Sequence, residues 1–269
     1  MLKKRILTAV IALPLLLIAI IALPPTAFTL LVGVLMLMAA WEWSLLAGIH
    51  KKSYRIFYVM FVFSGLFLSI FFSTVLFLWL TLLLWLWIFV AIIQYERQQT
   101  PLGFELAWVR KVTGFFLIIA AWEAIVILKA NPNFGPAWLI VLLVLIFSAD
   151  TGAYFAGRFF GKNKLCHRVS PKKTWEGFFG GLVLAMLVAA ISGGFLVATL
   201  KQYSGFLALS FVTALFSAVG DLGVSLQKRI VNIKDSGSLI PGHGGLWDRL
   251  DSIAAASVVF LCGALWLGL

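Results

Sequence analysis

The residues best suited to chemistry lie in one polar stretch near the C-terminus, KDSGSLIPGHGGLWDRLDS at residues 234–252. This stretch combines carboxylates, cations and glycines in a chain of 269 residues that is 62% hydrophobic and only 12% charged. Asp248 and Asp251 are three positions apart, so on a helix they share one face. Asp221 lies near the end of the preceding apolar stretch, and we expect it to meet this pair at one membrane depth.

Converging carboxylates of this kind form a hard, oxygen-lined site. Such a site suits Mg²⁺, which binds one or two carboxylates together with water and phosphate oxygens. Asp150 is a further acid deep inside an apolar stretch, where a charge is expensive and needs a partner or a function. The alternative is that each acid only pairs with a nearby cation, as Asp235 would with Lys228 or Lys234.

A second polar stretch, GKNKLCHRVSPKKTWEG at residues 161–177, supplies many of the cations. The order of Ser170, Lys172, Lys173 and Thr174 resembles the entry to a helix, with Thr174 as its N-cap. Backbone amides at a helix start, beside two lysines, form an anion site. The first stretch and the residues just before it add further cations and glycine turns that can approach phosphate oxygens. These are Lys228, Arg229, Lys234, His243, Gly244, Gly245 and Arg249.

The elements that must position these residues are long apolar segments. These apolar runs reach about 20 residues, and apolar and polar residues do not alternate within them. This pattern excludes the short strands of a β-barrel and indicates membrane-spanning helices. We therefore predict an all-α, polytopic integral membrane helix bundle of about nine transmembrane helices. The candidate segments are 6–23, 26–46, 56–73, 75–94, 112–128, 137–157, 176–199, 204–226 and 253–269.

The positive charges predict the orientation of this bundle. If the N-terminus is cytoplasmic, all 21 lysines and arginines except Lys129 and Lys201 fall on the cytoplasmic side. Both polar stretches then face the cytoplasm. We expect two parts, with helices 1–5 in residues 1–130 and helices 6–9, which carry the active site, in residues 131–269. Because a net charge of +11 is largely topological in such a protein, we do not expect a nucleic-acid partner.

Two glutamates inside the apolar segments are weaker candidates for function. Glu123 is expected to form a hydrogen bond within the bundle, and Glu42, between Trp41 and Trp43, to be interfacial and structural. The cations could also serve only as cytoplasmic anchors, as the residues from Lys3 to Arg55 do. That interpretation is poorer for the two polar stretches, because their cations are interleaved with acids and glycines.

Acids that bind metal, cations that bind phosphate and glycine turns at the cytoplasmic end of a bundle favour phosphoryl or nucleotidyl transfer. In such chemistry the protein mostly positions the reactants and neutralises charge. The polar substrate would enter from the cytosol and the lipid from the bilayer. The nucleotide is not identified, since Walker A, dinucleotide-binding and H-E-x-x-H motifs are absent from the sequence. A cation transporter, with Asp150, Asp221 and Glu123 along its path, is an alternative.

The run SLQKRIVNIKDSGSLIPGHGGLWDRLDS, residues 225–252, closely resembles the signature of phosphatidate cytidylyltransferases, also called CDP-diacylglycerol synthases. One departure is Gln227, which occupies a position that is apolar in the signature. The polar residues within 148–177 are similar to a second block of the family, whereas the N-terminal half is similar only in being hydrophobic and helical. The matching positions are Ser225, Lys228, Arg229, Lys234, Asp235, Gly237, His243, Gly244, Gly245, Asp248, Arg249 and Asp251.

The resemblance implies a Mg²⁺-dependent nucleotidyltransferase that converts CTP and phosphatidate into CDP-diacylglycerol and pyrophosphate for phospholipid biosynthesis. It also implies a homodimer. The short loops indicate a bacterial inner, or plasma, membrane, with the active site facing the cytoplasm. A CTP-dependent lipid or polyprenol kinase is the nearest alternative with this architecture. A CDP-alcohol phosphotransferase is disfavoured, because its motif of ordered aspartates is absent from the sequence.

The resemblance also assigns roles to single residues. Asp221 and Asp248 are the expected metal ligands, with Asp150, Asp235 and Asp251 in support. His243 is expected to position a phosphate rather than to act as a base. The expected catalytic residues are Asp221, Asp248, Lys228, Arg229, Asp235 and Asp251. The expected substrate-binding residues are Ser170, Lys172, Lys173, Thr174, Lys234, His243, Gly244, Gly245, Arg249 and Asp150.

Overall fold

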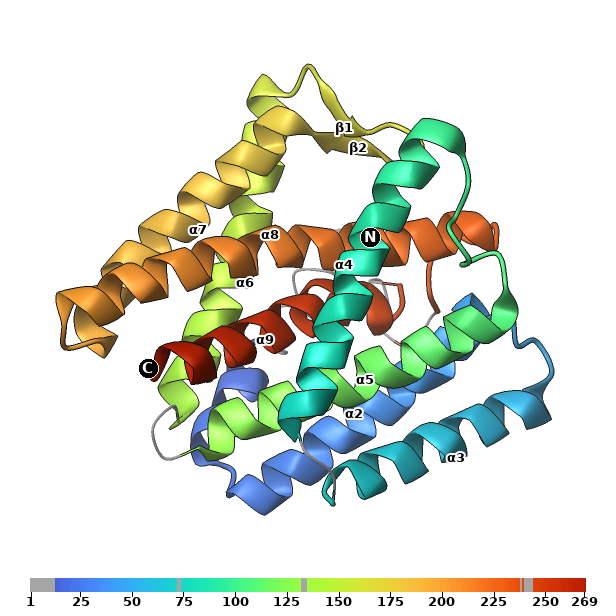
Figure 1. Ribbon diagram of the computed structural model, residues 1–269, viewed down its shortest axis with the longest axis horizontal. Coiled ribbons are helices and arrows are strands. Elements are labelled where there is room, and N and C mark those ends of the chain that lie inside the picture. Colours follow the sequence, from blue (N-terminus) through green and yellow to red (C-terminus); the bar gives the residue numbers. More distant parts are fainter. Residues whose placement is uncertain (1–12, 72–73, 132–134, 238, 240–243) are drawn as a thin grey trace.

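The computed structural model describes residues 13–71, 74–131, 135–237, 239 and 244–269, and this part of the chain is almost entirely helical (Figure 1). It contains nine helices and one two-stranded antiparallel hairpin. The first described helix is Leu13–Ala22. The others are α2 (Pro25–Leu46), α3 (Lys52–Ser69), α4 (Thr74–Gln98), α5 (Ala107–Ala130), α6 (Gly135–Phe160), α7 (Trp175–Leu196), α8 (Leu200–Ile230) and α9 (Trp247–Leu267), with strands β1 (Lys164–Cys166) and β2 (Ser170–Thr174) between α6 and α7.

Seven of the described helices, α2 and α4 to α9, are long and apolar enough to cross a membrane. The α3 helix falls outside this group because it begins with polar residues, Lys52, Ser53, Tyr54 and Arg55, which lower its mean hydropathy. The prediction of an all-α, polytopic membrane protein is therefore confirmed. Its boundaries differ where polar residues continue a helix: α8 extends beyond both predicted ends, and α9 begins at Trp247 rather than at residue 253.

Local sequence explains several of the helix starts. Pro25 occupies the first turn of α2, where its fixed φ suits the helix and its missing N–H leaves no hydrogen bond unmade. Thr174 caps α7, as the sequence predicts, and its Oγ1 accepts a hydrogen bond from the Gly177 amide at 3.1 Å. Ser170 to Thr174, however, form strand β2 before the helix begins. The polar connection between α6 and α7 is thus a hairpin.

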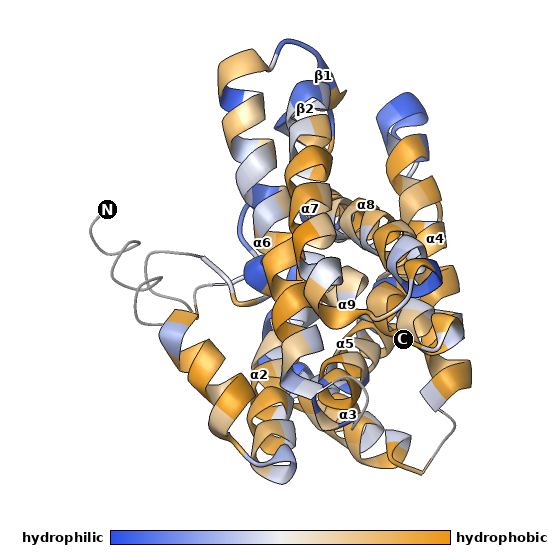
Figure 2. Ribbon diagram, turned by 90° about the vertical axis from the view of Figure 1, so that its left-hand side faces the viewer, coloured by the Kyte–Doolittle hydropathy of each residue, from blue (hydrophilic) through white to orange (hydrophobic). Residues whose placement is uncertain are grey.

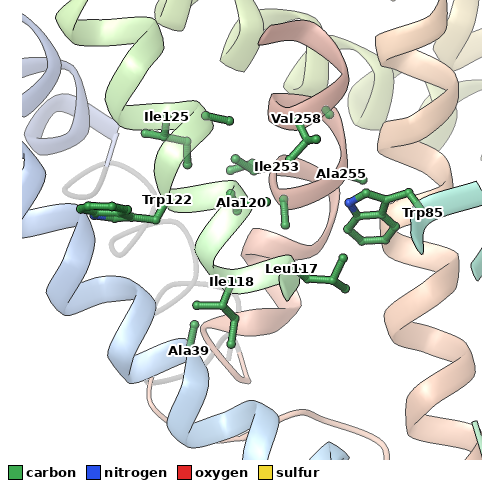
Figure 3. Packing of buried hydrophobic residues seen from close by; sticks show 14 of the residues in the cluster. Ala39, Trp85, Leu117, Ile118, Ala120, Trp122, Ile125, Ile253, Ala255 and Val258 are labelled. Carbon is green, nitrogen blue, oxygen red and sulfur yellow. The ribbon is translucent and has the colours of Figure 1, made fainter. Parts of the chain in front are cut away.

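The helix α9 lies at the centre of the bundle, and every residue from Asp251 to Cys262 is buried. The α5 helix lies between α2 and α9, with Ile118 turned toward Ala39 of α2 and Ala120 toward α9 (Figure 3). The α8 helix runs beside α9, and α3 lies on the outer side of α2 and α5 (Figure 1). The core thus joins the N-terminal helices to those that carry the polar stretches.

The helices α6 and α7 pack closely through small residues. A Cβ atom added at Gly152 would lie 2.6 Å from the Gly180 carbonyl oxygen, and one at Gly181 would lie 2.6 Å from the Ala149 carbonyl oxygen. Glycine at such crossings lets the two backbones approach each other. The hairpin that joins these helices lies in one of the most hydrophilic parts of the protein, near the hydrophilic end of α4 (Figure 2).

Candidate active site

An ion pair links the hairpin to α8. Lys173 Nζ of β2 lies 2.6 Å from Asp221 Oδ2, and the two side chains are 28% and 36% exposed. The other oxygen of Asp221 lies 3.5 Å from Ser225 Oγ, one turn further along α8. Asp150 of α6 interacts electrostatically with both members of the pair. Residues from three separate elements therefore meet at an accessible position.

Close contact between α8 and α9 brings a third acid to this position. At Gly220 an added Cβ atom would overlap with the Asp251 carbonyl oxygen, so the two backbones touch there. The Asp251 side chain is buried and interacts electrostatically with Asp221, Lys173 and Lys228. The predicted meeting of Asp221 with the first turns of α9 therefore agrees with the structure, and glycine at position 220 permits it.

A second ion pair joins the end of α8 to the start of α9. Lys228 Nζ lies 2.8 Å from Asp248 Oδ1, and these side chains are only 17% and 12% exposed. Asp248 Oδ2 accepts hydrogen bonds from the backbone amides of Ser236 at 3.0 Å and Gly245 at 3.2 Å. A carboxylate in the first turn of a helix also interacts favourably with the helix dipole. Asp248 is thus tied to the connection before α9.

We refer to residues 231–237, 239 and 244–246, the described part of the connection before α9, as the α8–α9 loop. Glu42 of α2 contacts this loop and is only 1% exposed. Its Oε2 accepts hydrogen bonds from Ser236 Oγ at 3.3 Å and from the Trp247 amide at 2.9 Å, and its Oε1 accepts one from the Leu239 amide at 3.3 Å. The sequence predicted only an interfacial, structural Glu42. Its position inside an apolar segment was the one signal of a larger role.

The glycines of the α8–α9 loop fit closely around these carboxylates. An added Cβ atom at Gly237 would overlap with Glu42 Oε1, and one at Gly245 would lie 2.6 Å from Glu42 Oε2. Gly244 has a φ of +84°, which favours glycine. The expected phosphate binding by Gly244 and Gly245 stays a prediction, and the structure adds a packing role for Gly245.

The hairpin is also fixed at its other side. Arg229 Nε donates to the Val169 carbonyl oxygen at 3.1 Å, which joins the end of α8 to the turn of the hairpin. The Arg168 amide and side chain bond to Glu96 at the end of α4. Burial raises the pKa of the Cys166 thiol to about 11, while Glu96 acts in the same direction and Lys173 against it. The hydrogen bonds of Arg229 and Arg168 thus fix the hairpin whose second strand carries Lys173.

The remaining predicted residues lie around this centre or beyond it. Arg249 interacts electrostatically with Asp150. Lys172, Lys234 and Asp235 are exposed, and an added Cβ atom at Gly244 would lie 3.6 Å from Asp235 Oδ1. Ser170 is half-buried in β2, and Thr174 is occupied as a helix cap. His243 lies outside the described residues.

The donor chemistry of this site fits a hard divalent cation. A carboxylate offers about four lone-pair positions. Asp248 uses three of them, whereas Asp221, within the described part of the chain, has one hydrogen bond besides its ion pair, the 3.5 Å contact with Ser225. Among the described residues, no group of three His, Cys, Asp or Glu side chains already has the geometry to hold a metal. A metal would therefore be bound by one or two carboxylates, with the other ligands from substrate phosphates and water.

The comparisons with known proteins extend over the whole chain. The model of a family described as "Cytidylyltransferase family" matches residues 3–265. The chain is 38% identical over 269 residues to the phosphatidate cytidylyltransferase of Pseudomonas aeruginosa, covering 99% of this chain and 97% of that protein. It is 34% identical over 290 residues to the corresponding protein of Haemophilus influenzae, covering 97% of each. The chain therefore belongs to the phosphatidate cytidylyltransferase family.

Proposed function

We propose that this protein is a nucleotidyltransferase that transfers CMP from CTP to phosphatidate, giving CDP-diacylglycerol and pyrophosphate for phospholipid biosynthesis. The observation that carries the proposal is the ion pair of Lys173 and Asp221 at 2.6 Å beside the α8–α9 contact, in a chain of this family. Acids and cations that meet at an accessible point of a membrane bundle suit a reaction between two phosphate esters.

The reaction joins two anions. A phosphate oxygen of phosphatidate attacks the α-phosphorus of CTP, a new P–O bond forms, and the bond to pyrophosphate breaks with its electron pair leaving on pyrophosphate. A phosphomonoester has a second pKa near 6, so the attacking group is already largely a dianion at neutral pH. A strong general base is therefore not required, and the main task of the protein is to overcome charge repulsion.

The cations of the site perform this task. Lys173 and Lys228 lie in contact with the acids of α8 and α9, and Arg249 interacts with Asp150. They bind the triphosphate and the lipid phosphate through charge-assisted hydrogen bonds. Lys172 and Lys234, which are exposed, add to the positive potential around the site. Arg229 contributes by holding the hairpin, through its bond to Val169.

Asp221 and Asp248 are the residues that would hold Mg²⁺, with Asp150, Asp235 and Asp251 in support. When bound, the ion neutralises negative charge on the phosphate oxygens. Asp221 is suited to this role because it is accessible, and Asp248 because its orientation is fixed by two backbone amides. Lys173 and Lys228 neutralise part of the negative charge of these two carboxylates.

We propose that the protein lies in a bacterial inner membrane, with a cytoplasmic N-terminus and the active site on the cytoplasmic face. This orientation rests on the distribution of its lysines and arginines. We also propose that it acts as a homodimer, as the family resemblance implies. The division into residues 1–130 and 131–269 describes where the catalytic residues lie, since all of them belong to the second part.

The test uses purified protein in lipid nanodiscs with phosphatidate, Mg²⁺ and CTP labelled at either the α- or the γ-phosphorus. The expected result is transfer of the α-label to lipid, with one pyrophosphate released for each CDP-lipid formed. Transfer of the γ-label would identify a lipid kinase instead. Cation flux through proteoliposomes without release of pyrophosphate would identify a transporter.

A further inference from the structure

We propose that Glu42 is a positioning residue that holds the α8–α9 loop in place and, through it, orients Asp248. This inference deepens the proposed function and rests on it for its catalytic consequence. Glu42 belongs to α2, and its partners in the loop and α9 follow it by 194 to 205 residues in sequence. It is one of the least exposed charged residues in the described part of the chain. Its carboxylate accepts three hydrogen bonds, all from the loop or from the first residue of α9.

The hydrogen bonds form a continuous path from Glu42 to the site. Ser236 donates its hydroxyl to Glu42 and its amide to Asp248. Asp248 in turn forms the 2.8 Å ion pair with Lys228 of α8. A change at Glu42 therefore reaches Asp248 through a single residue. Since partners of this kind orient the groups that act on substrate, their loss typically reduces activity.

Only an acceptor with two oxygens satisfies this arrangement. The donors are two backbone amides and a hydroxyl, and a backbone N–H can donate a hydrogen bond but cannot accept one. A glutamine would keep the size of the side chain but replace one acceptor oxygen with an NH₂ group that faces a donor. Buried donors that lose their acceptor are strongly unfavourable, because water does not replace it.

The sequence of the loop is fitted to this carboxylate as well. Gly237 has no space for a side chain because Glu42 occupies it, and at Gly245 the space is taken by Ser236 Oγ together with Glu42 Oε2. Trp43, the residue after Glu42, and Trp247, whose amide donates to Glu42, also pack edge to face, with ring centroids 5.1 Å apart. The negative charge of Glu42 interacts with Arg55 of α3, which stacks on Trp41 at 3.8 Å. The N-terminal helices thus provide the support on which the loop rests.

The experiment compares Glu42→Gln with Glu123→Gln in full-length protein in nanodiscs. Glu123 is a matched control, since it is a buried glutamate, 5% exposed, on a neighbouring helix, and none of its described contacts is with the loop. Hydrogen exchange is measured at the amides of Leu239 and Trp247, and kcat and KM are measured for CTP. We expect Glu42→Gln to speed exchange at both amides and to lower kcat roughly 10- to 100-fold.

The remaining variants separate positioning from folding. Glu42→Asp restores the charge and should recover part of kcat, whereas Glu123→Gln should exchange and turn over like the wild type. Unchanged exchange at Leu239 and Trp247 in Glu42→Gln would overturn the proposal, as would faster exchange throughout α9. If Glu42→Gln does not fold, Ser236→Ala, which removes one donor, should still speed exchange at the loop, and no change there would refute the proposal. If the wild type forms no CDP-lipid, the proposed activity fails, while the exchange data still decide the role of Glu42.

Discussion

Two lysine–aspartate ion pairs lie in this site, and they differ in exposure and in the number of their partners. Lys173 and Asp221 are 28% and 36% exposed, and among the residues that the structure describes Asp221 has one hydrogen bond besides its lysine, at 3.5 Å. Lys228 and Asp248 are 17% and 12% exposed, and Asp248 also binds two backbone amides. Exposed pairs contribute little to stability, whereas breaking a buried pair leaves an uncompensated charge.

We infer from this difference that the two ion pairs have different roles within one site. The pair of Lys173 and Asp221 can exchange its internal contact for substrate phosphate and metal at little cost. The pair of Lys228 and Asp248 is held by the α8–α9 loop, which Glu42 supports from α2. We expect both pairs to take part in binding, the first as the pair that opens more easily and the second as the pair that also fixes the geometry of the α8–α9 loop.

Asp248→Asn should lose both turnover and stability. Turnover should fall by roughly 100-fold or more, which corresponds to a few kcal/mol of transition-state stabilisation. The change also leaves the half-buried Lys228 without its counter-charge, which should lower stability, though by less than the roughly 3 kcal/mol of a fully buried pair. CDP-lipid synthesis and thermal unfolding in detergent measure the two effects. An unchanged unfolding temperature would show that the buried pair has no structural role.

Gly220→Ala should separate α8 from α9. The new methyl group overlaps with the Asp251 carbonyl oxygen, so the helices must move apart, at about 1–3 kcal/mol for an overpacked contact. Because the same contact brings Asp221 to α9, turnover should fall as well. Gly194→Ala is the control, since an added Cβ atom there meets nothing within 4 Å. Equal turnover of the two variants would contradict the role of the crossing.

Lys173→Gln should raise the KM for CTP or phosphatidate by roughly tenfold, equivalent to about 1.4 kcal/mol of binding free energy. Its unfolding temperature should stay close to that of the wild type, because water reaches the half-buried ion pair and limits its contribution to about 1 kcal/mol. Steady-state kinetics with each substrate varied in turn, together with thermal unfolding, measure both. A large loss of stability with unchanged KM would reverse the proposed division between the two pairs.

Gln227→Leu should make the protein slightly more stable with unchanged turnover. Gln227 is 1% exposed, and both polar atoms of its amide lack a hydrogen-bond partner among the described residues. Leucine removes this unsatisfied amide, whose desolvation is unfavourable by about 1–3 kcal/mol. The position is also apolar in the family signature. A lower unfolding temperature in detergent would contradict the prediction that this amide is unsatisfied.

The helices, the cap at Thr174 and the meeting of Asp221 with Asp251 could be predicted from the sequence alone. Each of these follows from local patterns or from the rule that a charge inside a membrane segment needs a reason. The β1–β2 hairpin was missed because its strands have three and five residues and are mostly polar. The position of Glu42 was missed for another reason: its partners lie 194 to 205 residues away, and neither spacing nor periodicity reports such a contact.

Turnover by purified Asp221→Asn shows whether the acids of α8 and α9 form the active site. Asp221 is the accessible acid at which α6, α8, α9 and the hairpin meet, and the variant keeps the size of the side chain. We expect this variant to fold and unfold like the wild type but to form CDP-lipid roughly 100-fold more slowly or not at all. Near-normal synthesis of CDP-lipid by this variant would contradict the assignment of the site.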